Sequence, residues 1–225
     1  MEKKIPIELQ NLNFDEGQVL LIDKPYTWSS FQALKKVKYQ LKIKKIGHAG
    51  TLDPLATGLL ILCTGKKTKE IDIYQAQEKE YIGTLVLGKT TPCVDLEKDF
   101  DATFPFEHIS LEDLEKVRKQ FVGEIEQTPP IFSAIKQEGK RLYELARKGQ
   151  DTEIKSRIVH IENLELSAPT LPEINFRVVC SKGTYIRSLV RDIGLALNSG
   201  AYLKALRRTR IGEFEVENAW KIENW

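Results

Sequence analysis

The sequence predicts an α+β fold in which a mixed, largely antiparallel central sheet is flanked by helices. Stretches with the two-residue alternation of strands and stretches with the apolar spacing of helices follow one another, without the regular rhythm of a parallel sheet. The 225 residues are enough to bury a hydrophobic core without metals or disulfide bonds. Because no internal repeat, low-complexity tract or linker interrupts them, we expect a single domain over residues 1–225.

Five segments are predicted to be strands. The first, residues 17–23, contains an apolar run typical of a buried strand and leads into a loop at Lys24 and Pro25. The others lie near residues 81–88, 154–167, 173–180 and 211–216. A basic turn formed by Leu206, Arg207 and Arg208 is expected to precede the last strand.

Four segments are predicted to be helices. Ser29 or Ser30 can cap the first, which carries apolar residues on one face as far as Leu41. A capping box at Ser110 opens the second, which runs to about residue 121. A short third helix is expected at residues 142–148, and a fourth at residues 185–197, where Asn198 and Gly200 end it.

The composition excludes several classes of protein. Hydrophobic residues make up 41% and charged residues 29%, as in ordinary globular proteins. No apolar run approaches the roughly 18 residues that cross a bilayer, and the start of the chain lacks the apolar core of a signal peptide. The three cysteines are scattered, and no two histidines have metal-ligand spacing. We therefore expect a cytoplasmic protein with no membrane segment, metal site or disulfide framework.

Charge is unevenly distributed along a chain whose net charge is only +2. Residues 31–47 hold six lysines and no acid, and residues 182–210 hold seven basic residues against Asp192. Residues 93–126 reverse the sign, with ten acids against four bases. Such polarisation can form a basic face for phosphate backbones, although solvated helix faces whose charges cancel in space would give the same pattern.

The most unusual stretch is the loop GHAGTLDPLATG at residues 47–58. Its three glycines allow close backbone approach, and Pro54 favours an extended conformation at Asp53. A carboxylate fixed there, beside an apolar run, is well placed to be desolvated and to act as nucleophile or base. The alternative is an aspartate that closes a turn or caps a helix. His48 is a general base, a base-contacting group or a loop histidine.

A second candidate region is CSKGTYIRSL at residues 180–189, where a strand end, a glycine turn and a helix start follow one another. Free backbone N–H groups at the helix start, with Lys182 beside them, can hold phosphate. Arg187 can pair with a buried carboxylate such as Asp53, or it can be a surface arginine. Tyr81 can stack on a nucleobase or pack within a sheet. The Pro-Pro turn at residues 127–134 either scaffolds a site or simply connects two elements.

Several short motifs occur together and in order along the chain. They are GHAGTLDPLATG at 47–58, KEY at 79–81, QTPPIFSAIK at 127–136, CSKGTYIRS at 180–188 and LRR at 206–208. With these motifs the chain resembles the TruB family of tRNA pseudouridine synthases from about Gly17 to Trp220. Any one of them alone is a weak signal, but the ordered set is specific. The resemblance implies the catalytic fold of pseudouridine synthases.

The resemblance also implies roles for individual residues. Asp53 would be the essential catalytic aspartate, Tyr81 would stack on the target base and assist proton removal, and Arg187 would pair with Asp53. The expected substrate-binding residues are His48, Lys24, Pro25, Leu206, Lys182, Arg207 and Arg208. Among them, His48 would help hold the flipped-out RNA, Lys24 and Pro25 would support the floor of the site, and Leu206 would line the pocket. The lysine-rich helix and the Arg207-Arg208-Arg210 segment are expected to grip tRNA.

The implied reaction is the isomerisation of uridine 55 in the T loop of tRNA to pseudouridine. No cofactor is expected, because the product is an isomer; a carboxylate near C1′ and a closed pocket are enough. The uridine must first be flipped out of the folded loop. The residues leave open whether Asp53 attacks C1′, attacks C6 or removes a sugar proton. The expected partner is the T arm of tRNA, bound by a monomer that needs no protein partner.

Two departures from the family pattern stand out. Thr27 occupies a position where the family usually has glycine. Because a positive φ is costly for threonine, we expect the backbone of this turn to be remodelled. Many family members continue into a C-terminal RNA-binding domain of the PUA type, which we do not expect here. Other interpretations remain: a tRNA-binding or tRNA-folding module without catalysis, a synthase acting on another RNA, or an N-glycosidase that releases uracil.

Overall fold

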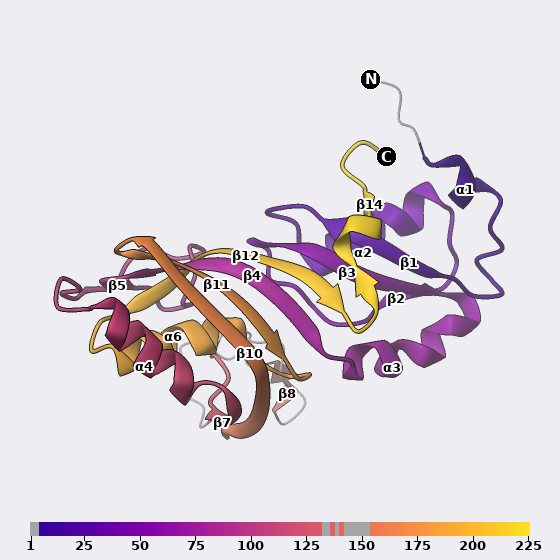
Figure 1. Cartoon of the computed structure of the whole chain (residues 1–225). Coiled ribbons are helices and arrows are strands. Elements are labelled where there is room, and N and C mark those ends of the chain that lie inside the picture. Colours follow the sequence, from indigo (N-terminus) through magenta and orange to yellow (C-terminus); the bar gives the residue numbers. More distant parts are fainter. Residues whose placement is uncertain (1–4, 132–135, 138–139, 142–153) are drawn as a thin grey trace. The chain divides into compact units, whose positions relative to one another are not determined.

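The computed structural model describes residues 5–131, 136–137, 140–141 and 154–225, which form two compact units (Figure 1). Unit 1 comprises residues up to 82 together with 205–225, and unit 2 comprises residues 83–204. Among the described residues, ten strands form one mixed sheet. Strands β4 (Lys79–Leu87) and β12 (Ala201–Ile211) each run through both units. The single-domain expectation stays a prediction.

The strands of unit 1 follow the order β14-β1-β3-β12. Strand β1 (Val19–Lys24) pairs antiparallel with β3 (Ala56–Thr64), which pairs parallel with β12. The short strands are β2 (Ile46–His48), β13 (Phe214–Glu215) and β14 (Trp220–Lys221). The loop between β2 and β3 carries Asp53. It leads into β3, which has β1 on one side and β12 on the other.

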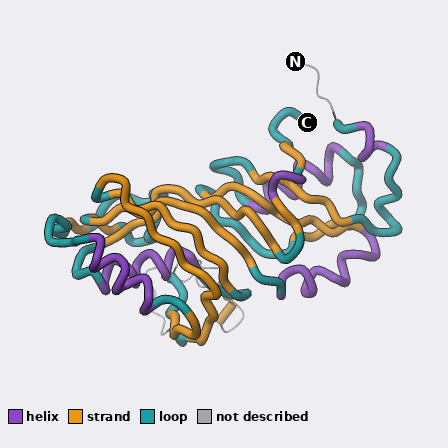
Figure 2. The backbone as a smooth tube through the Cα atoms, viewed as in Figure 1, coloured by secondary structure: helices purple, strands orange, loops and turns teal. Residues whose placement is uncertain are grey.

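The sheet of unit 1 is buried on both faces, which explains the continuous apolar run of β3. Leu60 and Leu62 pack with helix α2 (Ser30–Gln40) in one cluster, and Leu59 and Ile61 pack with Ile211 in another. The remaining helical segments of this unit are α1 (Ile7–Gln10), α3 (Ile71–Ala76) and the 3-10 turns Gly65–Glu70 and Val216–Asn218. Figure 2 shows these helices along the outside of the strands.

Unit 2 continues the sheet in the order β4-β11-β10-β7. Its main strands are β7 (Gly123–Gln127), β10 (Arg157–Thr170) and β11 (Glu173–Cys180), paired antiparallel. Helix α4 (Leu111–Gln120) packs on β10 and on helix α6 (Ile186–Ala196). The described part of this unit also contains two short antiparallel pairs, β5 (Lys89–Thr90) with β6 (Ala102–Thr103), and β8 (Lys136–Gln137) with β9 (Lys140–Arg141).

The structure confirms the predicted α+β class, with a mixed sheet whose pairs are mostly antiparallel. Ser110 forms a capping box at the start of its helix, as expected, and of the two candidate caps Ser29 and Ser30 it is Ser29 that caps α2. The prediction of a basic turn at residues 206–208 is wrong, because these residues lie inside β12. The helix expected at 142–148 lies outside the described residues. No helix in the described part of the chain has the length and apolar character to cross a membrane.

Candidate active site

The loop that carries Asp53 is held by its own backbone and by the close passage of β12. The Ala49 N–H donates to the carbonyl of Ile61 at 2.9 Å, and the Ala56 N–H donates to the carbonyl of Asp53 at 3.1 Å. Gly58 has φ +103°, and a Cβ there would lie 2.3 Å from the Arg208 carbonyl oxygen. Gly58 is therefore required where β3 and β12 meet, and the half-buried Asp53 stands at the entrance to β3.

The residue before Asp53 is fixed to the start of α2. The Ser30 hydroxyl donates to the Leu52 carbonyl at 3.1 Å and accepts from the Leu52 N–H at 2.8 Å, and both residues are buried. Ser29 caps the helix, which leaves the Ser30 side chain available for this role. The sequence suggested Ser30 only as an alternative cap, because a contact with a loop 22 residues away has no local signal.

The residue after Asp53 is fixed by Lys24, whose side chain is fully buried. Its ammonium donates to the carbonyls of Pro25 at 3.0 Å, of Pro54 at 3.2 Å and of Trp28. Burial lowers the Lys24 pKa to about 8, and the nearby Asp53 carboxylate partly offsets that effect. Lys24 thus joins the turn that follows β1 to the Asp53 loop; its support of the site floor stays a prediction.

The turn after Pro25 keeps a left-handed residue despite the departure at Thr27. Thr27 itself has φ 68°, and its hydroxyl donates to the Tyr26 carbonyl at 2.6 Å. The backbone therefore takes the conformation that a glycine would take more cheaply. Lys24 still reaches both Trp28 and Pro54 across this turn.

Arg208 lies beneath the Asp53 loop and is only 1% exposed. Its Nε donates to the Leu59 carbonyl at 2.7 Å and its Nη2 to the Gly50 carbonyl at 3.4 Å. Burial and the positive charge of Arg208 both lower the pKa of His48, which precedes the loop. His48 is therefore a neutral imidazole at pH 7, suited to hydrogen bonding and stacking more than to phosphate binding.

Arg207 points to the other side of β12 and forms an ion pair with Asp23. Its two terminal nitrogens lie 2.9 Å and 2.8 Å from the carboxylate oxygens, and this pairing raises the Arg207 pKa. Arg210 is paired with Glu78 at 2.8 Å. In the described part of the chain, these arginines and Arg208 are therefore engaged with the protein itself. Their predicted contact with RNA stays a prediction.

Two other expected site residues lie in neighbouring strands of unit 1. Tyr81 is buried in β4, two residues after the buried Lys79. Leu206 is also buried, and it pairs in register with Ala56, three residues beyond Asp53. The register of β12 against β3 therefore brings Leu206 to the end of the Asp53 loop.

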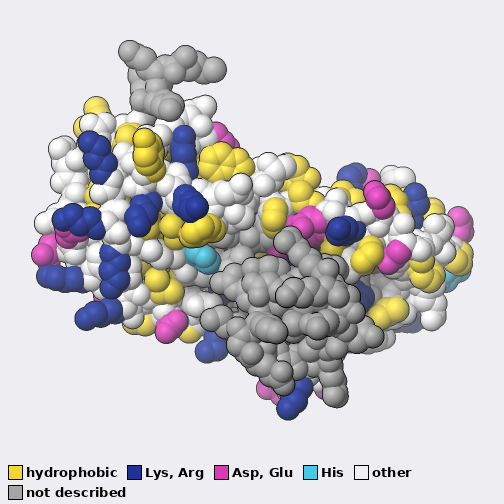
Figure 3. Space-filling view, turned by 180° about the vertical axis from the view of Figure 1, so that it is seen from behind, with side chains coloured by type: hydrophobic (Ala, Val, Ile, Leu, Met, Phe, Trp, Pro, Cys, Tyr) yellow, Lys and Arg dark blue, Asp and Glu magenta, His cyan; other side chains and the backbone are white. Residues whose placement is uncertain are grey.

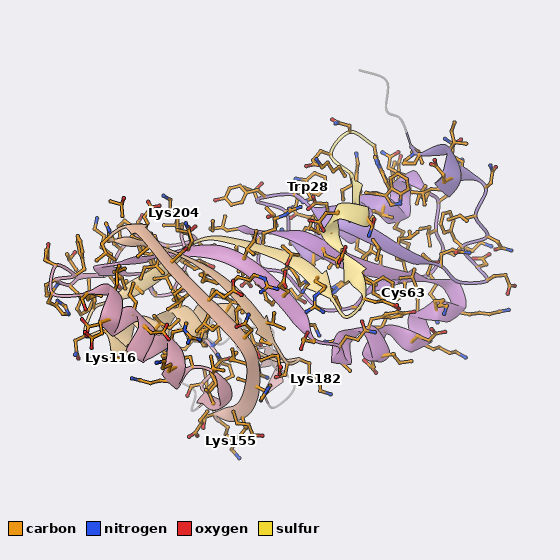
Figure 4. All side chains as sticks on the ribbon, in the orientation of Figure 1. Trp28, Cys63, Lys116, Lys155, Lys182 and Lys204 are labelled. Carbon is orange, nitrogen blue, oxygen red and sulfur yellow. The ribbon has the colours of Figure 1, made fainter. Side chains whose placement is uncertain are left out.

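Arg187 is buried near the start of α6 in unit 2. Its Nη1 donates to the Cys93 carbonyl at 3.1 Å, and its Nε lies 3.9 Å from a carboxylate oxygen of Asp95. Asp95 is only 3% exposed, and nothing in the sequence marked it as a site residue. The expected pairing of Arg187 with Asp53 stays a prediction, because the two belong to different units. Lys182 is exposed in the turn between β11 and α6 (Figure 4).

The start of α6 is fixed by Gln127, whose side chain is fully buried. Its Oε1 accepts from the Tyr185 N–H at 2.8 Å, and its Nε2 donates to the Tyr185 carbonyl at 3.1 Å. The neighbouring Thr128 carbonyl accepts from Ser188 at 2.8 Å and from Arg191 at 3.1 Å. The end of β7 therefore scaffolds the helix that carries Arg187. The last part of the predicted turn, residues 132–134, lies outside the described residues.

Comparison with known proteins identifies sequences that share this pattern. Residues 38–186 match the TruB family pseudouridylate synthase (N terminal domain), and residues 187–224 match the tRNA pseudouridylate synthase B C-terminal domain. The chain is 56% identical over 220 residues to the tRNA pseudouridine synthase B of Phocaeicola vulgatus, covering 95% of this chain and 94% of that protein. It is 61% identical over 214 residues to the protein of that name from Flavobacterium johnsoniae, covering 92% and 93%.

A solved structure supports the same relationship. A chain in the crystal structure of a Cbf5-Nop10-Gar1 complex matches with a TM-score of 0.70 and 31% identity. The match covers 94% of this chain and 53% of that one, so this chain spans about half the length of its structural relative. Sequence matches over nearly the whole chain agree with this likeness in fold. The chain belongs to the TruB family of pseudouridylate synthases.

Proposed function

We propose that this protein isomerises uridine 55 in the T loop of tRNA to pseudouridine, with Asp53 as the catalytic residue. The observation that carries the proposal is the fixation of the Asp53 loop from three directions. Ser30 holds the residue before Asp53, Lys24 holds the residue after it, and Arg208 holds Gly50 within the same loop. A carboxylate carried on a loop fixed in this way needs little reorganisation of that loop when charge develops on the substrate.

The reaction exchanges one glycosidic bond for another within the same nucleotide. The N1–C1′ bond breaks, the uracil rotates, and a C5–C1′ bond forms; the C5 proton is lost and N1 gains one. Asp53 serves this chemistry by attacking C1′, by attacking C6 of the uracil, or by removing a sugar proton. In each case the carboxylate must lie against the flipped-out nucleotide, as carboxylates do in glycosidases.

The pocket is completed by residues that hold the base and the backbone. Tyr81 stacks on the uracil and assists removal of the C5 proton, and Leu206 lines the pocket beside the Asp53 loop. His48, neutral at pH 7, holds the displaced RNA, and Lys182 contacts a phosphate. Arg187 pairs with Asp53 and orients its carboxylate, while Asp95 orients Arg187.

The remaining parts of the proposal concern the setting of the reaction. The substrate is the T arm of tRNA, bound by a monomer that needs no protein partner and works in the cytoplasm. Lys24 and Pro25 support the floor of the site without touching the reacting atoms. Size-exclusion chromatography with light scattering, with and without tRNA, tests the monomer directly.

The decisive experiment is tritium release from a tRNA transcript labelled at uridine C5. We expect the wild-type protein to release tritium and Asp53→Asn to lose activity by at least roughly 10³-fold while it still binds tRNA, because the amide keeps the shape but not the charge. A transcript that lacks uridine 55 should be inert. Asp53→Glu is a matched control that keeps the charge and moves it.

Each other outcome has its own meaning. Binding without tritium release would identify a tRNA-binding module, and release of free uracil would identify an N-glycosidase. Release from a transcript without uridine 55 would place the target elsewhere. Turnover by a clean Asp53→Asn preparation would remove Asp53 from the catalytic role.

A further inference from the structure

Helix α2 presents lysines and aromatic residues on the face opposite the core. Phe31, Lys35, Lys38 and Tyr39 are all exposed and lie on one face of the helix, and the exposed Lys42 follows its end. We call these five residues the α2 stripe. Phe31 is 57% exposed and Tyr39 is 82% exposed, which is unusual for large aromatic side chains.

The lysines of the α2 stripe have no acidic partner in the described part of the chain. Elsewhere in unit 1, Lys44 pairs with Asp15 and Lys66 pairs with Glu16. Lys35 instead lies over the Phe31 ring, with its Nζ 4.7 Å from the ring centroid. Lys35 and Lys38 lie three residues apart on the helix surface, where like charges repel each other, so helix stability does not explain this arrangement. Figure 3 shows the Lys and Arg side chains interspersed with hydrophobic ones on the surface of unit 1.

The α2 stripe begins beside the candidate active site. Ser30, the first residue of α2, makes both hydrogen bonds to Leu52, the neighbour of Asp53. At about 1.5 Å per residue, the 11 residues of the helix extend about 16 Å from that point. A nucleic-acid strand has a phosphate about every 3.4 Å along a duplex axis, so the helix spans about five phosphates. RNA held at Asp53 therefore has neighbouring phosphates within reach of these lysines.

Unlike these lysines, the arginines expected to grip RNA are already engaged within the protein. Arg207 is paired with Asp23, Arg210 is paired with Glu78, and Arg208 is buried beneath the Asp53 loop. A phosphate would have to compete with those bonds. The lysines of the α2 stripe can bind a phosphate without breaking an ion pair that the structure records.

We propose that the α2 stripe binds the sugar–phosphate backbone of the substrate tRNA outside the uridine pocket. Lys35, Lys38 and Lys42 contact phosphates, and Tyr39 packs against an exposed base or ribose. Exposed aromatics between cations are the features with which proteins hold RNA without reading its sequence. The proposal rests on the proposed function for the identity of the RNA and adds a binding surface to it.

The first test neutralises the three lysines together. We expect Lys35→Gln/Lys38→Gln/Lys42→Gln to weaken tRNA binding roughly tenfold or more at 0.1 M salt and to reduce the slope of log K against log salt by about 2 to 3. Single-turnover tritium release at saturating tRNA should stay within about threefold of wild type, because Asp53 is untouched. Circular dichroism checks that the fold is intact.

The matched control removes three lysines from unit 2. Lys98, Lys116 (labelled in Figure 4) and Lys119 are exposed. On α4, Lys116 pairs with Glu112 and Lys119 pairs with Glu115. Lys98→Gln/Lys116→Gln/Lys119→Gln changes the net charge by the same amount. We expect this control to bind tRNA within about threefold of wild type. Equal losses in both triple variants would mean that net charge alone matters, and the proposal would fail.

The aromatic part of the stripe has its own test. Tyr39→Ala should weaken tRNA binding about fivefold or more, whereas Tyr39→Phe, which keeps the stacking ring, should bind like wild type. Equal binding by the alanine variant and wild type would contradict the packing role of Tyr39.

Two RNA substrates locate the contact and separate this proposal from the proposed function. A loss with an isolated T-arm stem-loop places the contacted phosphates in the T arm, and a loss with full-length tRNA alone places them elsewhere; either supports the proposal. Unchanged affinity and salt slope for both RNAs would overturn it. If wild type binds tRNA but forms no product, the proposed function fails while the effect of the stripe on binding is still measured.

Discussion

Thr27 shows how one residue can keep a turn at an energetic cost. Its φ of 68° lies in the left-handed region, which costs an L-residue about 1–2 kcal/mol and disfavours β-branched side chains further. Thr27→Gly removes that strain, although glycine has more conformational freedom to lose on folding. We expect a net gain of up to about 1 kcal/mol in the free energy of unfolding, measured by urea denaturation. A less stable glycine variant would show that the hydrogen bond of the threonine hydroxyl stabilises the turn by more than the backbone strain costs.

Lys24 links the stability of the protein to pH. Its native pKa of about 8 lies below its ordinary value of 10.5, mainly because of burial. Between these values the unfolded chain holds a proton that the native state has lost, so the free energy of unfolding rises with pH from about 8 to 10.5. The rise approaches about 1.4 kcal/mol per pH unit, and below pH 8 the cost of the buried charge is fully present.

The comparison with Lys24→Met isolates this effect, because the other titrating groups are common to both proteins. We expect the free energy of unfolding of the wild type to increase relative to that of the variant as the pH rises from 8 to 10.5. Denaturant unfolding at several pH values measures both profiles. Parallel profiles would mean that the Lys24 pKa is close to normal.

The candidate site could be recognised residue by residue only where its signals are local. The Gly-rich loop, Pro54 and the following apolar run all lie within a dozen residues of Asp53, so the sequence marks that aspartate as a candidate. Ser30 and Asp95 carry no such mark, and Gln127 is marked only as part of a turn that could equally be a plain connection, because their roles arise from contacts with residues far along the chain. The same long-range contacts fix the backbone of the loop that carries Asp53, which its neighbouring sequence does not reveal.

At the scale of elements, the end of β7 determines where α6 begins. Gln127→Met keeps the length of the side chain and removes both hydrogen bonds to Tyr185. We expect a loss of about 1–3 kcal/mol in stability. We also expect at least a roughly tenfold lower kcat with KM for tRNA changed less than about threefold, because Arg187 follows Tyr185 by two residues. Tritium-release kinetics together with thermal unfolding separate the two effects.

Ser188→Ala is the control for this element. It removes one hydrogen bond between α6 and Thr128 but leaves the Gln127–Tyr185 pair in place. We expect it to lose stability with little change in kcat. A kcat loss as large as that of Gln127→Met, or an unchanged kcat in a folded Gln127→Met, would contradict the positioning role of Gln127.

Elements were predictable where local chemistry defines their ends. Ser29 and Ser110 signal helix starts through side-chain caps that involve only the next three residues. The sequence did not predict the strand β12 at residues 206–208, because consecutive arginines are typical of a solvated turn. Arg208 points inward there, which is possible only because carbonyls of Leu59 and Gly50, some 150 residues earlier, accept its hydrogen bonds.

At the scale of the whole molecule, residues 205–225 complete the unit that carries Asp53. Residues 205–225 return to unit 1, where Arg208 holds the Asp53 loop and Ile222 enters the core cluster around α2. That cluster also includes Ala33 and Val37, so it supports the helix whose first residue, Ser30, binds Leu52. The site therefore depends on packing between the beginning and the end of the chain.

This dependence predicts a coupled loss of stability and activity in Ile222→Ala. Ile222 is fully buried, so the truncation should cost about 2–5 kcal/mol and lower the melting temperature of unit 1. Because α2 holds the Asp53 loop, tritium-release activity should disappear over the same lowered temperature range. The matched control, Ile158→Ala, removes the same atoms from a side chain that is 65% exposed and should cost less than about 0.5 kcal/mol. If activity in Ile222→Ala survives above the temperature at which its core melts, the Asp53 loop is held without the C-terminal packing.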